Sequence, residues 1–286
     1  MVDVVVRPRG PYSLALTARH ASDATRLFRD GVLEALLPAG DRVEHTAARQ
    51  FPDGSLRLVA ESEESLAALR FVLAIDDDHS EFLRRFRDDA MLGPATSKLA
   101  GLRPIRVATL AQALLRALCG QLIETKRARF LERRIVRAVM PAHGSLHAPP
   151  SAEALAALAP AELRRLGLHA RRGATLVRVC GSLDLERLRG QPAETVAARL
   201  GRERGLGPWS VGVVALEGLG RYDLGIVGDL GLVKLLSAMR GRWVEAWETE
   251  ELLAPYGEWA GLASVYMLVA WTRGLLPVSP AARHAA

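Results

Sequence analysis

The chain has 286 residues, of which 49% are hydrophobic and 24% are charged, and its formal net charge is +6 at pH 7. This length suits one large domain or two to three smaller ones. No apolar run approaches the ~18 residues that a membrane-spanning helix requires, and the first residues lack the apolar stretch of a signal peptide. These features exclude a membrane protein and predict a soluble protein of the cytoplasm.

The net charge and the arginine content indicate what kind of molecule the protein binds. A sequence pI of about 9.9 favours a polyanion such as nucleic acid. Only Lys98, Lys126 and Lys234 are lysines, so nearly all basic residues are arginine, which suits phosphate recognition. Codon bias in a GC-rich genome explains the arginine excess at least as well, so charge alone does not decide the partner.

Metal centres built from side chains are not predicted. Cys119 and Cys180 stand far apart and form no C-x-x-C pair, which excludes a zinc site or four-cysteine iron–sulfur cluster made from cysteine alone. The seven histidines are scattered. The acidic run at residues 76–78 lacks the spacing of a calcium loop, and we expect it to cap a helix at 80–90.

Residues 1–90 are predicted to form a small α+β domain. Val2–Val6 is a run of β-branched residues, and Ser13–Arg19 alternates in the manner of a strand. Asp30-Gly31 and Asp53-Gly54 are typical of tight hairpin turns. Further strands are predicted near residues 25–29, 32–37, 42–49 and 55–60, followed by a helix at 63–74. One antiparallel sheet packed by a helix or two accounts for these elements.

Residues 91–286 are predicted to be helical throughout. An apolar-periodic stretch at 107–139 opens this region, and prolines separate the segments that follow. Helices are predicted at 107–119, 120–139, 151–158, 160–166, 169–180, 184–189, 192–202, 208–219, 230–239, 245–252 and 257–273. No period of 20–50 residues recurs, so the chain is not a solenoid. The predicted fold class is therefore α+β, a sheet domain followed by an all-α region.

A glycine-rich turn joins two of these helices. Gly205 and Gly207 lie between the helical patterns at 192–202 and 208–219, and Pro208 suits the first position of the second helix. A turn that opens a helix presents free N–H groups and the positive end of the helix dipole. The sequence therefore predicts a phosphate-binding turn.

A lone carboxylate, Asp229, follows 20 positions after Trp209, just ahead of the helix at 230–239. The run Gly-Leu-Gly-Pro-Trp-Ser at 205–210, with Asp229 and Lys234, resembles the hairpin and acidic residue of the helix-hairpin-helix DNA glycosylases, especially their 3-methyladenine DNA glycosylase II branch. Ala117–Ile123, which contains Gln121 and Leu122, also matches this family. The resemblance implies a TATA-binding-protein-like sheet in the first domain and a two-lobed helical glycosylase region after it.

The resemblance also implies how DNA is held. Backbone N–H groups near Gly205 and Gly207 would bind a phosphate, and the carbonyls of Gly201, Glu203 and Gly205 would share a sodium or potassium ion. No other cofactor is implied. Side chains assigned to DNA by this match are Gln121, Ser210 and Lys234. Such a grip on the backbone is blind to base sequence.

Leu122 would be the wedge that fills the gap left by an extruded base. Taken alone, the pattern favours a leucine of the core, and only the family match reverses that preference. The basic run from His169 to Arg172 aligns with the family as well, and Arg171 or Arg172 would face a phosphate. A solvated charged face is the ordinary alternative.

Asp229 is the predicted catalytic residue, because a carboxylate stabilises the positive charge that glycosidic cleavage builds on the sugar. A plain helix N-cap is the competing role and is compatible with catalysis. Bifunctional relatives carry a lysine in the hairpin where this chain has Trp209, and an indole forms no Schiff base. Lys234 lies on another helix. The sequence therefore predicts a monofunctional enzyme that leaves an abasic site.

The resemblance implies that Trp209, Trp271 and Leu230 lie at the base pocket, with Leu230 where the family carries an aromatic residue. Aromatic faces attract cationic alkylated purines. Each tryptophan is equally plausible as a core residue. The predicted substrate is double-stranded DNA with alkylated bases, and the predicted state is a monomer. Two alternatives stay open: a glycosylase for oxidised or deaminated bases, and a non-catalytic DNA-binding module.

Overall fold

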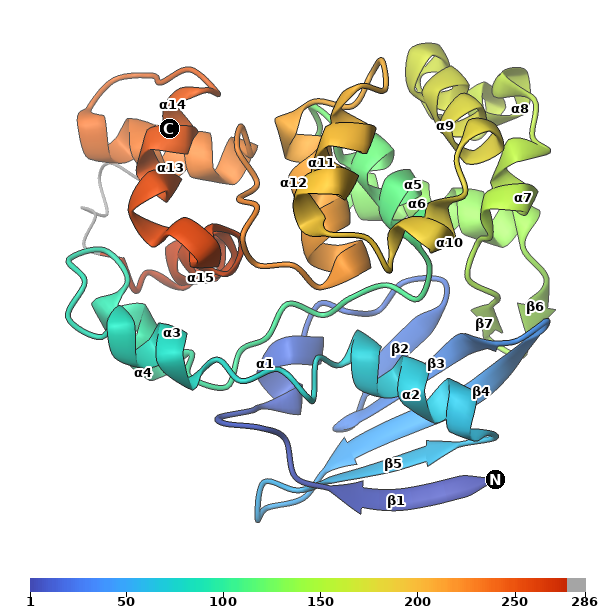
Figure 1. Ribbon diagram of the computed structural model, residues 1–286, viewed down its shortest axis with the longest axis horizontal. Coiled ribbons are helices and arrows are strands. Elements are labelled where there is room, and N and C mark those ends of the chain that lie inside the picture. The colour runs from blue at the N-terminus through green and yellow to red at the C-terminus, as the bar shows by residue number, and fades with distance from the viewer. Residues whose placement is uncertain (277–286) are drawn as a thin grey trace.

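A computed structural model describes residues 1–276, which form a sheet with two helices against it and a larger helical part (Figure 1). The sheet is five-stranded and antiparallel, in the order β1-β5-β4-β3-β2. Its strands are β1 (Val2–Val6), β2 (Arg26–Arg29), β3 (Val32–Ala39), β4 (Arg42–Gln50) and β5 (Leu56–Ala60). The strands predicted at Val2–Val6 and near residues 25–29, 32–37, 42–49 and 55–60 are confirmed, and so is the turn at Asp30 and Gly31, where φ is 51° and 77°.

Helices α1 (Leu14–Ala18) and α2 (Glu63–Val72) flank the sheet. Alternate residues of the strands are buried, so one face packs with these helices around Leu33, Leu58 and Leu69. The sheet is thus a half-buried antiparallel layer. Whether it has TATA-binding-protein-like form stays a prediction.

The prediction of a strand at Ser13–Arg19 is wrong, because this segment forms α1. Leu14, Thr17 and Ala18 are its buried residues, which is the spacing of one helix face. The Ser13 side chain accepts a hydrogen bond from the Leu16 backbone N–H at 3.2 Å and caps the helix. The Ser13 cap and the helical spacing of the buried residues therefore decide the structure of this segment, although its residues alternate as in a strand.

The helical part contains α3 (Ser80–Arg85), α4 (Gly93–Lys98), α5 (Leu110–Gly120), α6 (Thr125–Val139), α7 (Ala152–Ala156), α8 (Pro160–Arg165), α9 (Ala170–Ser182), α10 (Leu185–Leu188), α11 (Ala193–Gly201), α12 (Pro208–Val213), α13 (Leu230–Arg240), α14 (Glu248–Leu253) and α15 (Ala260–Arg273). A π-helical segment η1 (Val214–Leu219) continues α12, and a 3-10 turn η2 (Ala254–Trp259) precedes α15. Among residues 1–276, no helix is long and apolar enough to cross a bilayer.

The expectation of helix throughout after residue 91 is wrong at one place. Two short strands, β6 (Ala142–His143) and β7 (Leu146–His147), pair as a hairpin around Gly144, whose φ is 64°. His147 donates its backbone N–H to the carbonyl of Ala24, so the hairpin is tied to the sheet part of the chain. Pro141 and Gly144 interrupt the helical pattern there.

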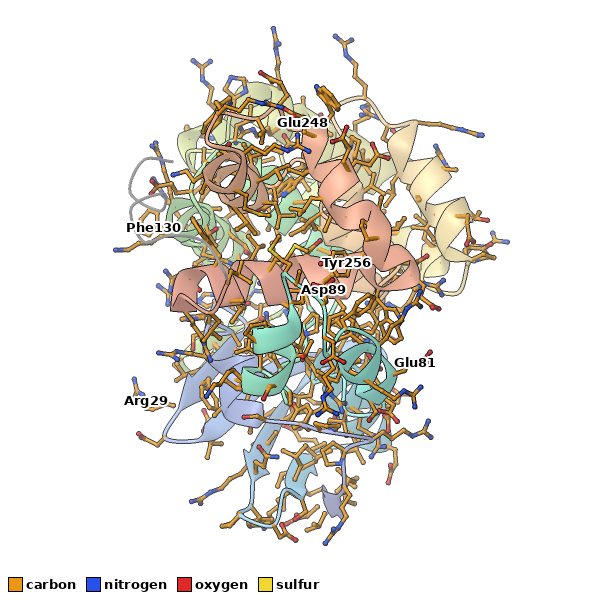
Figure 2. All side chains as sticks on the ribbon, turned by 90° about the vertical axis from the view of Figure 1, so that its left-hand side faces the viewer. Arg29, Glu81, Asp89, Phe130, Glu248 and Tyr256 are labelled. Carbon is orange, nitrogen blue, oxygen red and sulfur yellow. The ribbon has the colours of Figure 1, made fainter. Side chains whose placement is uncertain are left out.

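The change from one core to the other falls near α3. Ile75 still packs in the core of the sheet, whereas Phe82 belongs to the helical core and lies 4.9 Å from the ring of Tyr266 in α15. Tyr256 donates to Asp89 across the same region at 3.1 Å, and Figure 2 shows the two side chains together. The domain boundary at residue 90 stays a prediction.

The acidic run at 76–78 does more than cap a helix. Asp78 accepts a hydrogen bond from the Ser80 backbone N–H at 2.9 Å, which supports the start of α3. Asp77 instead pairs with Arg106 and accepts from the Tyr222 hydroxyl. These contacts join the loop before α3 to the helical part.

A buried ion cluster joins the two parts near α5. The Arg116 guanidinium of α5 contacts the carboxylates of Glu132 at 2.8 Å, Glu217 at 2.6 Å and Asp23 at 2.7 Å. Burial by itself lowers the pKa of Arg116, but the surrounding carboxylates raise it well above its usual value. The cluster therefore fixes α5, α6, η1 and the loop before β2 in one arrangement.

Candidate active site

The glycine turn between α11 and α12 has the predicted geometry. Gly205 has a φ of +94°, and a Cβ there would lie 2.5 Å from the Thr175 hydroxyl, so another residue would be strained and crowded. Gly207 is the N-cap of α12, and Pro208 takes its first position. Gly205 and Gly207 are exposed. The turn therefore presents its backbone to solvent at the upper edge of the molecule (Figure 1).

Gln121 braces this turn against the end of α5. Its Nε2 donates to the Gly205 carbonyl and to the Ser210 hydroxyl, both at 2.9 Å. Ser210 is only 2% exposed. Two of the side chains assigned to DNA thus bond to each other, and their direct contact with DNA stays a prediction.

Leu122 stands free of the core. It is 95% exposed, so the alternative of a buried core leucine is wrong. Its φ of +54° is unusual for a residue with a branched side chain and costs about 1–2 kcal/mol. The apolar side chain of Leu122 therefore points into solvent beside the glycine turn, on a backbone of unfavourable conformation.

A hollow of about 350 Å³ opens next to Leu122. Besides Gln121 and Leu122 it is lined by Gly205 and by residues at the start of α9, namely His169, Arg171, Arg172 and Thr175. The basic run predicted from the sequence therefore lies beside the apolar side chain. Arg171 is exposed, whereas burial lowers the pKa of the partly buried Arg172.

Asp229 caps α13 and carries a second hydrogen bond. Its Oδ1 accepts from the Gly231 backbone N–H at 2.8 Å, as an N-cap residue does. Its Oδ2 accepts from the indole N–H of Trp209 at 3.0 Å. The side chain is only partly buried. Each oxygen keeps a lone pair that faces neither donor and is available to a substrate or a water.

Trp209 links the glycine turn to this carboxylate. The ring lies against Gly120 of α5, where an added Cβ would approach its Cη2 to 2.6 Å. A glycine at 120 therefore makes room for the indole. Because the N–H of the same ring is bonded to Asp229, the tryptophan holds the acid at a fixed place relative to the turn.

The remaining predicted residues lie around α13 and α15. Leu230 directly follows Asp229 and is 43% exposed. Lys234 is half-buried about one and a half turns further along α13. Trp271 is half-buried on α15 and packs against the helical core. The structure therefore brings Trp209, Leu230 and Asp229 together, and Trp271 stands on the neighbouring helix.

The carbonyls expected to hold a cation already take part in the turn. The carbonyl of Glu203 accepts from the Leu206 backbone N–H at 3.0 Å, and that of Gly205 accepts from Gln121. Each keeps a second lone pair, so both fit a weakly held monovalent ion. The Glu203 carboxylate itself pairs with Arg178 and Arg199. Among residues 1–276 no cluster of three or more His, Cys, Asp or Glu forms a metal site.

Two exposed tryptophans near Asp229 were not predicted. Trp243 and Trp247 are 57% and 62% exposed on the loop between α13 and α14. A Cβ on Gly228, the residue before Asp229, would lie 3.4 Å from Ala246, so this loop packs against the segment that leads into Asp229. The only sequence signal was two tryptophans four positions apart in a polar segment.

A second, mainly apolar groove of about 540 Å³ also borders the turn. Gly207, Pro208, Leu253 and Ala260 are among its lining residues. Asp229 and Trp209 are not part of it. The predicted catalytic residue therefore lies outside the larger groove.

Comparisons with known proteins agree with this geometry. The "DNA-3-methyladenine glycosylase" of Bacillus subtilis (strain 168) is 24% identical over 204 residues, which are 68% of this chain and 67% of that protein. The "Probable bifunctional transcriptional activator/DNA repair enzyme AlkA" of Mycobacterium tuberculosis (strain ATCC 25618 / H37Rv) is 31% identical over 171 residues, 58% of this chain and 34% of that protein. The chain thus spans about a third of the latter. No family model matches the chain.

Solved structures share the fold over nearly the whole chain. The "3-methyladenine dna-glycosylase from Archaeoglobus fulgidus" superposes with a TM-score of 0.83 at 18% identity and covers 94% of this chain and 98% of its own. An 8-oxoguanine glycosylase/lyase of Clostridium acetobutylicum, in complex with double-stranded DNA, gives a TM-score of 0.78 at 15% identity and covers 95% and 96%. Together with the braced hairpin and the carboxylate beside it, these similarities support the resemblance of the chain to the helix-hairpin-helix DNA glycosylases.

Proposed function

We propose that this protein is a monofunctional DNA glycosylase of base excision repair that removes alkylated bases such as 3-methyladenine from double-stranded DNA. The observation that carries the proposal is the hydrogen bond of 3.0 Å between Trp209 and Asp229, which fixes a carboxylate beside a phosphate-binding turn. The names of the curated relatives support an alkylated substrate.

Asp229 is the group that acts on the sugar. When the bond between C1′ and the base breaks, the base leaves with the bonding electrons and positive charge grows on the sugar ring. A carboxylate nearby stabilises that charge and accepts a proton from the water that adds to C1′. Its two hydrogen bonds orient the acid without occupying all of its lone pairs.

The reaction first requires the base to leave the helix, at a few kcal/mol. Leu122 is suited to the gap in the stack, because it is almost fully exposed and follows Gln121, whose side chain is bonded to the Gly205 carbonyl. The exposed backbone at Gly205 and Gly207 would anchor a nearby phosphate, with a sodium or potassium ion on the carbonyls of the turn. The proposed roles of Leu122 in filling the stack, of the glycine turn in binding phosphate and of Asp229 in catalysis would thus lie on one edge of the molecule.

Strand cleavage by a lyase step needs an amine that attacks C1′. The position after Pro208 holds Trp209, whose N–H is bonded to Asp229. Lys234 lies on α13 and is half-buried there. The product is therefore an intact strand with an abasic site. We further propose that the enzyme acts inside the cell as a monomer.

Chromatography of released bases tests the function directly. The protein is incubated with duplex DNA that has been methylated, deaminated or oxidised, and the free bases are separated. We expect 3-methyladenine from the methylated DNA and a strand that breaks only after alkali. Release of only oxidised or deaminated bases would contradict the alkylated substrate. A covalent adduct between protein and DNA that borohydride traps would contradict the absence of a lyase step.

A further inference from the structure

A strongly basic face runs along the outer side of α6 and continues onto the end of α8. We call it the α6 basic face. It consists of Lys126, Arg127, Phe130, Arg133, Arg134 and Arg137 of α6 with Arg164 and Arg165 of α8. Residues three, four and seven apart share one side of a helix, so the six α6 residues gather on one stripe. Phe130 is 61% exposed and stands on the outer flank of the helical part in Figure 2.

The fold does not account for these charges. The opposite side of α6 supplies the buried contacts, through Leu131, Glu132 and Ile135. The acidic Glu132 is turned inward to Arg116. Within residues 1–276, none of the seven cations on the face has a carboxylate within 4 Å, although 19 such pairs occur elsewhere. Unpaired cations at this density repel one another, which points to an external polyanion.

The two helices present a continuous surface. The Arg134 guanidinium donates to the carbonyl of Arg165 at 3.4 Å, so the end of α8 lies against the middle of α6. Arg164 and Arg165 are both exposed. The face therefore extends sideways across two elements rather than being a single row of solvated side chains.

The face begins where DNA is expected. Leu122 precedes the start of α6 at Thr125 by only three residues. The 15 residues of α6 span about 22 Å, which matches six to seven base pairs at about 3.4 Å each. A duplex opened at Leu122 would thus have backbone within reach of the face along its flank.

We propose that the α6 basic face binds the phosphates of undamaged duplex next to the lesion, and so extends the DNA-binding surface beyond the hairpin and Leu122. The proposal rests on the proposed function for the place of the lesion, but its contacts do not depend on catalysis. The cations bind phosphate without reading bases. Phe130 carries no charge and contributes only apolar contact.

Salt dependence of duplex binding tests the proposal. The double variant Arg134→Gln, Arg137→Gln is compared with the parent on an undamaged duplex of about two helical turns, by fluorescence anisotropy at 50 to 200 mM salt. Loss of two phosphate contacts lowers the slope of log affinity against log salt by about 1.8. The ratio of parent affinity to variant affinity is then roughly tenfold smaller at 200 mM than at 50 mM salt.

A matched control separates this effect from net charge. Arg84 and Arg87 are exposed at α3, far along the chain from the face, and Arg84→Gln, Arg87→Gln removes the same charge. We expect the parent slope for this control and for Phe130→Ala. Single-turnover base release at saturating damaged DNA is expected to stay within about twofold of the parent in all variants.

An unchanged salt slope in Arg134→Gln, Arg137→Gln would overturn the proposal, and so would an equal change in the control. Binding of an acidic peptide at the face with unchanged DNA affinity would likewise overturn it in favour of a protein partner. Failure of the proposed function has a different signature: no base is released by the parent, while the duplex-binding measurement remains interpretable.

Discussion

Trp209 and Asp229 form the smallest unit on which the proposed chemistry depends. The indole is wedged against Gly120 and its N–H is bonded to the acid, so position and orientation of the carboxylate come from the same ring. We therefore propose that Trp209, expected to contact the damaged base, also positions the carboxylate of Asp229.

Replacement of Trp209 by phenylalanine tests that role. The variant keeps an aromatic ring against Gly120 but loses the hydrogen bond to Asp229. A hydrogen bond to a charged group is worth about 1.5–3 kcal/mol, so we expect base release to slow by about ten- to a hundredfold. Single-turnover kinetics with saturating DNA measure this. Parent-like rates would show that Asp229 is held by its cap alone.

His79 is the second residue whose environment makes a measurable prediction. It is 1% exposed, and neither ring nitrogen has a hydrogen-bond partner among the described residues. Burial, reinforced by the positive charge of Arg103, lowers its pKa from 6.5 to about 4, although Asp77 and Asp78 act in the opposite direction. The histidine is therefore neutral in the folded protein at pH 7.

This shift makes folding sensitive to mild acid. Below pH 6.5 the unfolded chain binds a proton at His79 that the folded chain refuses until about pH 4, so the free energy of unfolding falls as the pH drops through this window. The upper limit of the loss is about 3 kcal/mol. In His79→Phe we expect a smaller loss between pH 6.5 and 4.5, measured by urea unfolding. The exposed His20→Gln serves as control, and equal pH profiles for all three proteins would contradict the assignment.

At the scale of elements, the ion cluster around Arg116 holds the end of α5 that carries Gln121 and Leu122. Burial raises the pKa of Asp23, but Arg26 and Arg116 outweigh it and keep that pKa below its usual value. Glu217 lies in the π-helical segment that follows α12. The π-helical segment thus places Glu217 within reach of Arg116, at 2.6 Å.

Arg116→Met is predicted to destabilise the fold by about 3–5 kcal/mol, because it leaves buried carboxylates without their shared partner. The comparison is Arg85→Met, whose partner Glu258 lies at 3.2 Å and is largely exposed; surface pairs contribute at most about 1 kcal/mol. Urea unfolding of both variants measures the difference. If the two variants unfolded at similar urea concentrations, the ion cluster around Arg116 would not stabilise the contact between α5, α6, η1 and the loop before β2.

Much of the element order was predictable from sequence. Hairpin turns, Pro208 at a helix start and Asp229 as an N-cap are local signals that the structure confirms. The β6–β7 hairpin was missed because it is held by a distant segment, through the bond of His147 to Ala24. Helix α1 was missed because the alternation of Ser13–Arg19 hid its Ser13 cap and its helical spacing of buried residues. No pattern indicated that Trp209 bonds to Asp229, since 20 residues of chain separate them.

At the scale of the whole molecule, the structure arranges its functional features along one edge. In Figure 1 the turn before α12 and the loop between α13 and α14 both lie at the top, opposite the sheet. Five of the exposed large apolar side chains lie on α13, on the loop after it, or at Leu122: they are Leu122, Leu230, Met239, Trp243 and Trp247. An edge with exposed apolar side chains, a braced turn and arginines at the start of α9 is suited to a distorted duplex.

The most direct test of the central claim is the substitution Asp229→Asn, assayed for release of 3-methyladenine and for binding of the same duplex. Asparagine keeps the cap acceptor for Gly231 but lacks the charge. The account predicts that base release falls by about a hundredfold or more while duplex affinity stays within about twofold. Release at the parent rate would contradict it.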